Sequence, residues 1–332
     1  MQNKQCRLVH RPVGTPKASD FTFTSEAIPS LQEGQLLLKT LYISLDPAMR
    51  GWMNDAKSYL PPVGLGEVMR AGTVSEVIES KNPHYQAKDY VVSMNGIQEY
   101  FASDGKGLMK INTSLAPLPT FLGTLGITGL TAYFGLLKIG EPKAGETVVV
   151  SGSAGAVGMI VGQIAKLKGC KVVGIAGEKE KCDYVVQELG FDACINYKTD
   201  NLKKALHQNC PNGIDVYFDN VGGEILDTVL TQINFGARIP LCGAISQYNT
   251  TEPIKAPSNY LSLLVNRGKL QGFIVFDYFK EYPSAINEMA TWLKEGKLKT
   301  KEQVISGGVE AFLPSLLMLF EGKNTGKLVL EV

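Results

Sequence analysis

Three glycines at a regular spacing are the residues of this sequence that most directly suggest chemistry. Gly152, Gly155 and Gly158 follow an apolar β-branched run at 147–150 and precede apolar residues at helical spacing over 159–167. Glycine lets the backbone approach a diphosphate, and the amides at a helix start attract its negative charge. The spacing is GxxGxxG and not the commoner GxGxxG, so its context between strand and helix carries the prediction. We predict a dinucleotide site, with an ordinary tight turn as the alternative.

The residues after the next expected strand, 171–176, bear on which nucleotide binds. Enzymes that use NAD commonly carry an acidic residue here, which accepts a hydrogen bond from the ribose 2′-hydroxyl, and Glu178 is close to that position. Lys179 and Lys181 could instead neutralise a 2′-phosphate, or could form a solvated helix start. With Tyr197 further along the chain, the pattern favours NADPH over NADH.

Two later segments follow predicted strands of the same sheet. Residues 219–223 read DNVGG, and residues 242–248 read CGAISQY. Because the carboxyl ends of parallel strands meet at one edge of the sheet, both loops should flank the bound nucleotide. The alternative for each segment is a plain strand-to-helix turn.

The metal-ligating residue types are sparse and scattered. None of the histidines His10, His84 and His207 has a cysteine at a spacing typical of zinc ligands. We therefore expect no metal. The cysteines lack CxxC spacing, which is typical of reduced, mostly buried thiols in a cytoplasmic protein. They are Cys6, Cys170, Cys182, Cys194, Cys210 and Cys242.

The elements that must position these residues fall into three stretches. Residues 1–116 read as short strands separated by turn clusters, which indicates a mostly β domain. Residues 121–298 alternate strands and helices, which predicts an α/β fold with a doubly wound parallel sheet. A helix near 311–320 and a closing strand at 327–332 should rejoin the first domain. The strands of the α/β stretch are expected at 147–151, 171–176, 193–196, 215–219, 236–242 and 270–275.

The charge balance excludes some partners. The 332 residues contain 33 Lys+Arg against 32 Asp+Glu, so nothing indicates nucleic acid or an anionic membrane surface. The first residues lack the apolar core of a secretory signal. An uncharged run at 111–137 contains prolines and glycines that argue against a membrane span.

Stretches along the chain are typical of one family of enzymes. They are ISLDPAMRGWM (43–53), LGEVMRAGTVSEVIESKNP (65–83), GITGLTAYFGLL (126–137), SGSAGAVGMIVGQIAKLKGCKVVGIAG (151–177), GFDACINYKT (190–199), FDNVGGE (218–224), CGAISQYN (242–249), LQGFIVFDY (270–278) and GKNTGKLVL (322–330). In these stretches, and over nearly its whole length, the chain resembles the zinc-independent medium-chain dehydrogenase/reductases of the prostaglandin reductase, leukotriene B4 dehydrogenase and alkenal double-bond reductase group. The bacterial NADPH-dependent curcumin reductases look most similar.

The resemblance implies a fold of two domains. A GroES-like, mostly β substrate domain would consist of residues 1–120 and 299–332, and a Rossmann NADP-binding domain of residues 121–298 would be inserted into it. The zinc-binding Gly-His-Glu of related alcohol dehydrogenases is represented by Leu65-Gly66-Glu67. The missing histidine agrees with the expectation of no metal.

The resemblance also implies roles for individual residues. For the chemistry that the resemblance implies, our hypothesis is that the substrate carbonyl oxygen accepts a hydrogen bond from the nicotinamide ribose hydroxyl or from a tyrosine, Tyr248 or Tyr59, with positioning alone and solvent as proton source as the alternative. Ala48 and Val265 depart from family positions that often hold tyrosine, which bears on the substrate. The cofactor residues implied are Gly152, Ala154, Gly155, Ala156, Val157 and Gly158 at the diphosphate, Lys181 and Tyr197 at the 2′-phosphate, and Asn220, Cys242, Gly243, Ala244, Ile245, Ser246, Tyr248, Phe273, Ile274, Val275 and Asn324 elsewhere.

The activity implied by the resemblance is reduction of a carbon–carbon double bond conjugated to a carbonyl, with NADPH as hydride donor. A quinone reductase of the zinc-free branch and a non-enzymatic nucleotide-binding protein on the same fold are the alternatives. The segment 270–275 is a plausible edge strand for pairing two copies, so we expect a homodimer.

Overall fold

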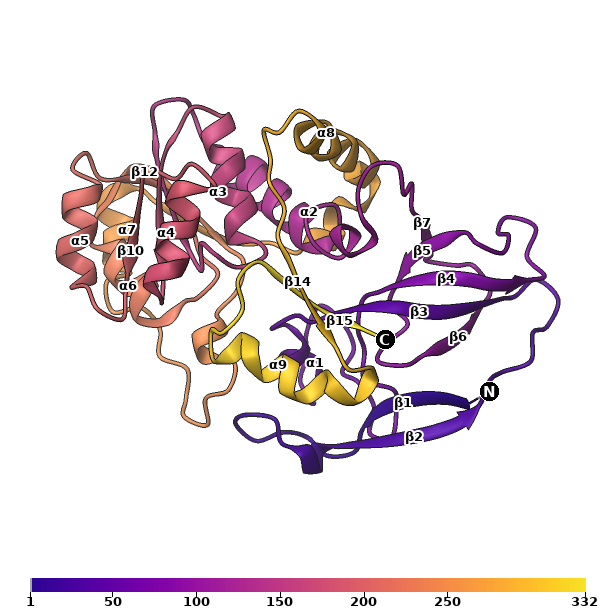
Figure 1. The fold of residues 1–332 in the computed structure, drawn as a ribbon. Coiled ribbons are helices and arrows are strands. Elements are labelled where there is room, and N and C mark those ends of the chain that lie inside the picture. Colours follow the sequence, from indigo (N-terminus) through magenta and orange to yellow (C-terminus); the bar gives the residue numbers. More distant parts are fainter. Residues whose placement is uncertain (1) are drawn as a thin grey trace. The chain divides into compact units, whose positions relative to one another are not determined.

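The computed structural model describes residues 2–332, which form two units (Figure 1). Unit 1 holds the chain up to Leu122 together with Glu302–Val332, and unit 2 holds Gly123–Lys301. Each unit has its own sheet and its own hydrophobic core. No helix within residues 2–332 has the length and apolar character that a membrane span requires.

Unit 2 is built on a six-stranded parallel sheet in the order β10-β9-β8-β11-β12-β13. The central strand β8 is buried along its whole length, as its run of valines predicts. The order reverses direction on the two sides of β8, which is the arrangement of a doubly wound sheet. The strands are β8 (Thr147–Ser151), β9 (Lys171–Ala176), β10 (Ala193–Asn196), β11 (Ile214–Phe218), β12 (Ile233–Leu241) and β13 (Lys269–Gly272).

Helices cover both faces of this sheet. Figure 1 shows α3 and α4 on one side of the strands and α5 on the other. On the second side, Leu206 of α5 and Val229 of α6 share a buried cluster with Val149 of β8. The helices of unit 2 are α2 (Ile127–Phe134), α3 (Gly158–Leu167), α4 (Lys179–Gln187), α5 (Leu202–Asn209), α6 (Gly223–Leu230), α7 (Leu261–Asn266) and α8 (Tyr282–Lys294), with a π-helical segment η3 (Gly135–Gly140) and 3-10 turns η4 (Ile245–Gln247) and η5 (Val275–Glu281).

The strand predicted at 270–275 is wrong at its carboxyl end. Strand β13 stops at Gly272, and the 3-10 turn η5 begins at Val275. Aromatic packing accounts for the difference, because the ring of Tyr278 in η5 stacks on Phe134 with ring centroids 4.8 Å apart. An extended chain through Val275 could not return Tyr278 to that position. The edge place of β13 in the sheet agrees with the prediction.

Unit 1 contains a seven-stranded sheet and a two-stranded hairpin. The larger sheet has the order β14-β15-β3-β4-β5-β7, and β6 also pairs with β3. The late strand β15 lies beside the early strand β3, so the end of the chain does join the first β stretch. The elements are β1 (Gln2–Leu8), β2 (Phe21–Ala27), β3 (Leu36–Ser44), β4 (Thr73–Ser80), β5 (Tyr90–Ser93), β6 (Tyr100–Ser103), β7 (Met109–Lys110), β14 (Glu302–Ser306), β15 (Lys327–Glu331), α1 (Met49–Trp52), α9 (Phe312–Phe320), η1 (Ala18–Asp20), η2 (Leu118–Phe121) and η6 (Val309–Ala311).

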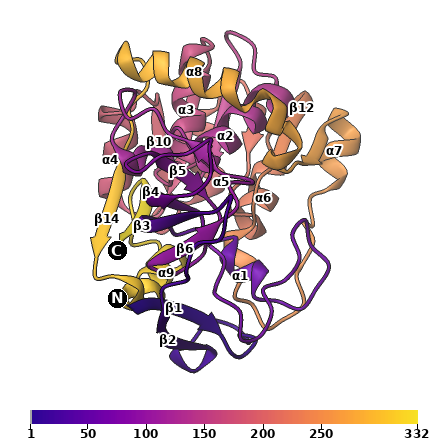
Figure 2. The same ribbon diagram turned by 90° about the vertical axis from the view of Figure 1, so that its right-hand side faces the viewer.

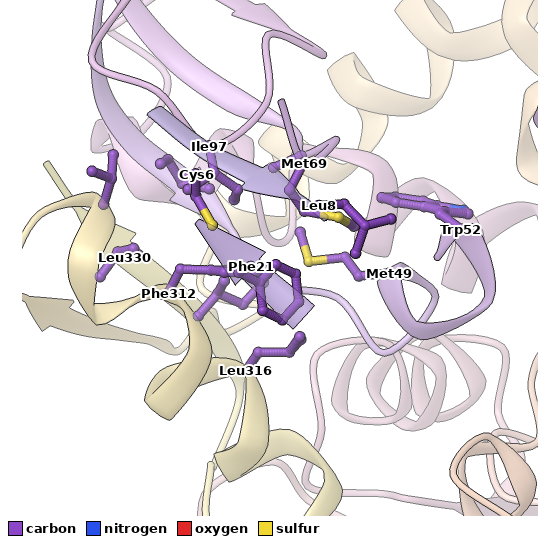
Figure 3. Packing of buried hydrophobic residues seen from close by; sticks show 14 of the residues in the cluster. Cys6, Leu8, Phe21, Met49, Trp52, Met69, Ile97, Phe312, Leu316 and Leu330 are labelled. Carbon is purple, nitrogen blue, oxygen red and sulfur yellow. The ribbon is translucent and has the colours of Figure 1, made fainter. Parts of the chain in front are cut away.

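Helix α9 supplies the core of unit 1. It lies between the β1–β2 hairpin and the larger sheet (Figure 2). Phe312 of α9 packs edge to face against Phe21 of the hairpin, with ring centroids 5.4 Å apart. Cys6 and Leu330 belong to the same cluster (Figure 3). The C-terminal segment is therefore part of the core of unit 1 and not an appendage.

Candidate functional site

The glycine turn between β8 and α3 is closed too tightly for side chains at two positions. Gly152 has φ of +59°, a left-handed conformation that side chains disfavour. A Cβ on Gly158 would lie 2.3 Å from the carbonyl oxygen of Gly152, whereas one on Gly155 would lie 3.2 Å from it. The geometry explains why glycine stands at positions 152 and 158, and it leaves a bare backbone surface.

The start of α3 directs peptide amides out of this turn. The helical hydrogen-bond ladder begins at the carbonyl of Gly155, which accepts from the amide of Met159 at 3.0 Å. The amides of Ala156, Val157 and Gly158 precede the ladder and receive no acceptor from it. Ala154 is buried in the turn. Amides at a helix start together with a turn that lacks side chains suit a diphosphate.

Charged and hydroxyl side chains gather where β9 ends. Glu178 forms an ion pair with Lys198 at 2.7 Å, and the Tyr197 hydroxyl lies 3.1 Å from where a Cβ of Gly177 would stand. Lys181 is half-buried in the first turn of α4, and burial lowers its pKa. An anion beside this ammonium would offset that effect, so the residues fit a 2′-phosphate.

Lys198 is a residue that the sequence analysis missed. Lys198 follows Tyr197 directly in the chain. It pairs with the carboxylate of Glu178 and holds the pKa of that carboxyl below its ordinary value. Glu178 is thus engaged with a cation, which weakens the case for a ribose 2′-hydroxyl acceptor. Only the pairing of β10 with β9 places these two side chains together, so the sequence held no local signal for it.

Asp219 anchors the loop after β11 and was also missed as an individual residue. Its Oδ1 accepts hydrogen bonds from the Tyr217 hydroxyl at 2.8 Å and from the Gly222 amide at 2.9 Å, among others. Burial raises the pKa of Asp219. The neighbouring Asn220 donates from its side chain to the Ser151 carbonyl at 2.7 Å. The signal available in the sequence was an acidic residue at the end of an apolar strand.

The loops after β11 and β12 are tied together. The carbonyl of Asp219 accepts from the amides of Cys242 at 2.9 Å and Gly243 at 3.1 Å. Ser246 donates its hydroxyl to the Val221 carbonyl at 2.6 Å. The two loops predicted to flank a nucleotide are therefore held side by side, on the edge of the sheet where the glycine turn lies.

A cavity of about 510 Å³ opens beside these loops. The Tyr248 hydroxyl accepts from the amide of Ala244 at 3.1 Å on its wall. The lining residues are Leu241, Cys242, Gly243, Ala244, Tyr248, Gly272, Phe273, Ile274 and Asp277.

Several predicted site residues lie apart from the cavity lining. Val275 is buried and is not a lining residue, whereas Phe273 lines the cavity and its ring packs against Phe218 with centroids 6.2 Å apart. Tyr59 and Asn324 belong to unit 1, where the Tyr59 hydroxyl accepts from the indole of Trp52 at 3.1 Å and Asn324 donates to the Gly326 carbonyl at 3.0 Å. Roles for Tyr59 and Asn324 at the cofactor stay predictions.

Within residues 2–332, no three histidine, cysteine or acidic side chains lie together as a metal site would require. Glu67 instead accepts a hydrogen bond from the amide of Gly64 at 2.8 Å.

Comparison with known proteins covers both units. Residues 4–111 match the family model described as the N-terminal domain of oxidoreductase, and residues 156–291 match the model described as zinc-binding dehydrogenase. The chain is 45% identical to the NADPH-dependent curcumin reductase of Escherichia coli (strain K12), covering 100% of this chain and 97% of that protein. It is 40% identical to the NADP(+)-dependent 2-alkenal reductase of Nicotiana tabacum, covering 100% and 98%.

A solved structure agrees along the whole chain. The crystal structure of CurA in complex with NADPH from Vibrio vulnificus superposes with a TM-score of 0.94 at 45% identity, covering 99% of each chain. Likeness of this extent over both units fixes the family as well as the fold. The chain belongs to the medium-chain dehydrogenase/reductases, in the group that contains NADPH-dependent curcumin reductase and 2-alkenal reductase.

Proposed function

We propose that this protein reduces the carbon–carbon double bond of α,β-unsaturated ketones or aldehydes, with NADPH as the hydride donor. The observation that carries the proposal is the full-length identity of 40–45% to a 2-alkenal reductase and a curcumin reductase. The bare glycine turn and the cation cluster after β9 support the same cofactor independently.

The cofactor would be held along one edge of the unit 2 sheet. The glycine turn from Ala154 to Gly158 would hold the diphosphate, with the amides of Ala156, Val157 and Gly158 as donors. Lys181 and Tyr197 would contact the 2′-phosphate, while Lys198 keeps its ion pair with Glu178. The nicotinamide would lie in the cavity beside Cys242–Tyr248 and Phe273–Ile274. Asn220 would face it from the neighbouring loop.

The bound NADPH supplies the hydride, which is added to the β-carbon of the substrate. The protein must then stabilise negative charge that develops on the carbonyl oxygen. Tyr248 suits this task because a neutral phenol donates a hydrogen bond at neutral pH, and its hydroxyl is fixed by the Ala244 amide. Tyr59 is the second candidate donor, and solvent is the alternative proton source.

The experiment is to follow NADPH consumption with conjugated aldehydes, ketones and diarylheptanoids, and to identify the product. We expect saturation of the double bond with the carbonyl intact, and slower reaction with NADH. Faster reduction of a quinone than of any enone would favour a quinone reductase. Tight NADPH binding without oxidation by either substrate class would favour a non-enzymatic nucleotide-binding protein.

We also propose a homodimer in the cytoplasm. Strand β13 is an edge strand whose backbone can pair with a second copy, and helix α7 beside β12 exposes Leu264 and Val265. Six free cysteines support a reducing compartment. The near-zero net charge supports neither nucleic acid nor a membrane surface as a partner.

A further inference from the structure

Two cysteines face each other between helix α4 and strand β10. The sulfur atoms of Cys182 and Cys194 lie 2.7 Å apart, and the thiol of Cys194 donates toward Cys182. Cys182 is 9% exposed, and Cys194 is partly exposed. Both cysteines are free thiols. Their oxidation would form a disulfide, whose sulfur atoms are about 2.0 Å apart.

The pair lies under the residues proposed to hold the adenosine end of the cofactor. Cys182 follows Lys181 directly in α4, and Tyr197 follows β10, which carries Cys194. The Cys194 sulfur is also 3.8 Å from the hydroxyl of Ser153, a residue of the glycine turn. A bond between the two sulfurs would thus join the helix that bears Lys181 to the strand that leads to Tyr197.

We propose that Cys182 and Cys194 form a reversible disulfide when the protein meets a hydroperoxide, and that this disulfide weakens binding of the 2′-phosphate of NADPH. The second half rests on the proposed function, in which Lys181 and Tyr197 contact that phosphate. The disulfide itself depends only on the geometry of the two cysteines.

The chemistry balances with the hydroperoxide as the two-electron oxidant. The Cys182 thiolate attacks the outer peroxide oxygen, the O–O bond breaks, and a sulfenic acid and an alcohol or water result. The Cys194 sulfur then attacks the sulfenic sulfur and water leaves. The hydrogen bond from Cys194 lowers the pKa of Cys182, which favours Cys182 as the first nucleophile. An external dithiol reverses the bond by thiol exchange.

Closure of the bond acts on the first turn of α4. The two sulfurs must approach by about 0.7 Å, since a disulfide is about 2.0 Å long. Glu178, the N-cap of α4, and Lys181 lie in the turn that must move with Cys182 when the bond forms. Charge-assisted hydrogen bonds to phosphate depend on donor distance and direction. NADH, which lacks the 2′-phosphate, should be affected little.

The first measurement is peptide mapping by mass spectrometry on the full chain. The reduced protein is treated with hydrogen peroxide, blocked with an alkylating agent and digested. We expect a cross-linked peptide pair that contains Cys182 and Cys194 and disappears with dithiothreitol. Because it uses the unmodified chain, the result does not depend on any variant folding. Recovery of both cysteines alkylated, or oxidised without a cross-link, would overturn the proposal.

The second measurement is calorimetric binding of NADPH and of NADH before and after peroxide. We expect the dissociation constant of NADPH to rise about fivefold or more and that of NADH to change less than about twofold, because only the phosphate contacts are altered. Cys182→Ser and Cys194→Ser should remove the response to peroxide. Cys170→Ser is the matched control, because Cys170 is also a buried free thiol and donates to the Lys143 carbonyl at 3.3 Å.

The two proposals fail in different ways. A disulfide that leaves NADPH affinity unchanged would overturn the regulatory inference while the reductase activity stands. Equal binding of NADPH and NADH by the reduced protein would instead contradict the assigned 2′-phosphate contacts, whatever the state of the cysteines.

Discussion

Lys181 is the residue on which the choice of cofactor should depend. Burial lowers its pKa, and a 2′-phosphate would supply the negative charge that compensates. We expect Lys181→Ala to raise the dissociation constant of NADPH about tenfold, since a charge-assisted hydrogen bond is lost. Titration calorimetry with NADPH and NADH measures the change, and NADH binding should hardly move.

Lys179→Ala is the matched control for that substitution. Lys179 lies in the same turn of α4 but is exposed and paired with Asp183 at 2.5 Å. Its removal should leave both affinities close to those of the unmodified protein. If Lys181→Ala lost as much affinity for NADH as for NADPH, Lys181 would not be a contact of the 2′-phosphate.

Tyr248 tests the proposed hydrogen-bond donor. We expect Tyr248→Phe to lower kcat for an enone about tenfold or more, with an unchanged melting temperature, because one preorganised donor to the developing oxyanion is removed. Stopped-flow measurement of NADPH oxidation reports the step. Tyr260→Phe, at an exposed tyrosine before α7, should behave like the unmodified protein. Identical kinetics for both variants would exclude Tyr248 from catalysis.

At the scale of elements, two glycines of the turn between β8 and α3 differ in the space that a side chain would have. A Cβ at Gly158 would meet the Gly152 carbonyl oxygen at 2.3 Å, but one at Gly155 would stay 3.2 Å away. We expect Gly158→Ala to lower the free energy of unfolding by about 1–3 kcal/mol and Gly155→Ala to lower it by less than about 1 kcal/mol. Denaturant titration compares them, and equal losses would contradict this geometry.

An ion pair joins the segment before β8 to β12 and gives stability a pH dependence. Arg238 binds the Glu146 carboxylate through both terminal nitrogens, and the two side chains are largely buried. Burial acts to raise the pKa of Glu146, but the Arg238 hydrogen bonds outweigh it and hold the pKa below the ordinary 4.5. The stabilisation is therefore present above pH 4.5 and is lost as pH falls through the lowered pKa.

We expect Glu146→Gln to destabilise the protein at about pH 7 and to differ less from the unmodified protein near pH 3, because the Glu146 carboxylate loses its charge as the pH falls through its lowered pKa. Urea unfolding at the two pH values measures the difference. Glu295→Gln is the control, because Glu295 pairs with Lys297 on the surface and should matter at neither pH. A difference that does not depend on pH would exclude the ion pair as its cause.

Prediction from the sequence succeeded where a local pattern determines the structure. The strands at 147–151, 171–176 and 193–196 are confirmed to the residue, because apolar β-branched runs in a parallel sheet are bounded by glycine and polar residues. The end of β13 was misjudged because its turn is set by aromatic packing with α2. The Glu178–Lys198 pair and the hydrogen bond from the Ser151 hydroxyl to Asp219 also arise from strand neighbours that the sequence does not display.

At the scale of the whole molecule, a second copy of the chain would cover the exposed edge at β13 and the apolar face of α7. Leu264 is 74% exposed there. We expect light scattering to give the mass of a dimer, and Leu264→Asp to shift it toward the monomer, because a charge would be buried in the interface. Val13→Asp, at an exposed valine of unit 1, should leave the mass unchanged. A monomeric mass for the unmodified protein would contradict the pairing.

The position of β15 determines which of the two large sheets can be completed first during synthesis. Lys327, buried at the start of that strand, donates to the carbonyl of Leu45, 282 residues earlier, and also binds Asp46 at 2.9 Å. Until β15 has been synthesised, residues 42–44 of β3 lack their neighbour on that side, although β6 already pairs with residues 36–39, whereas every strand of unit 2 precedes β15 in the chain. The nascent chain can therefore complete its nucleotide-binding sheet first, and the sheet around β3 must wait for the last strand to emerge.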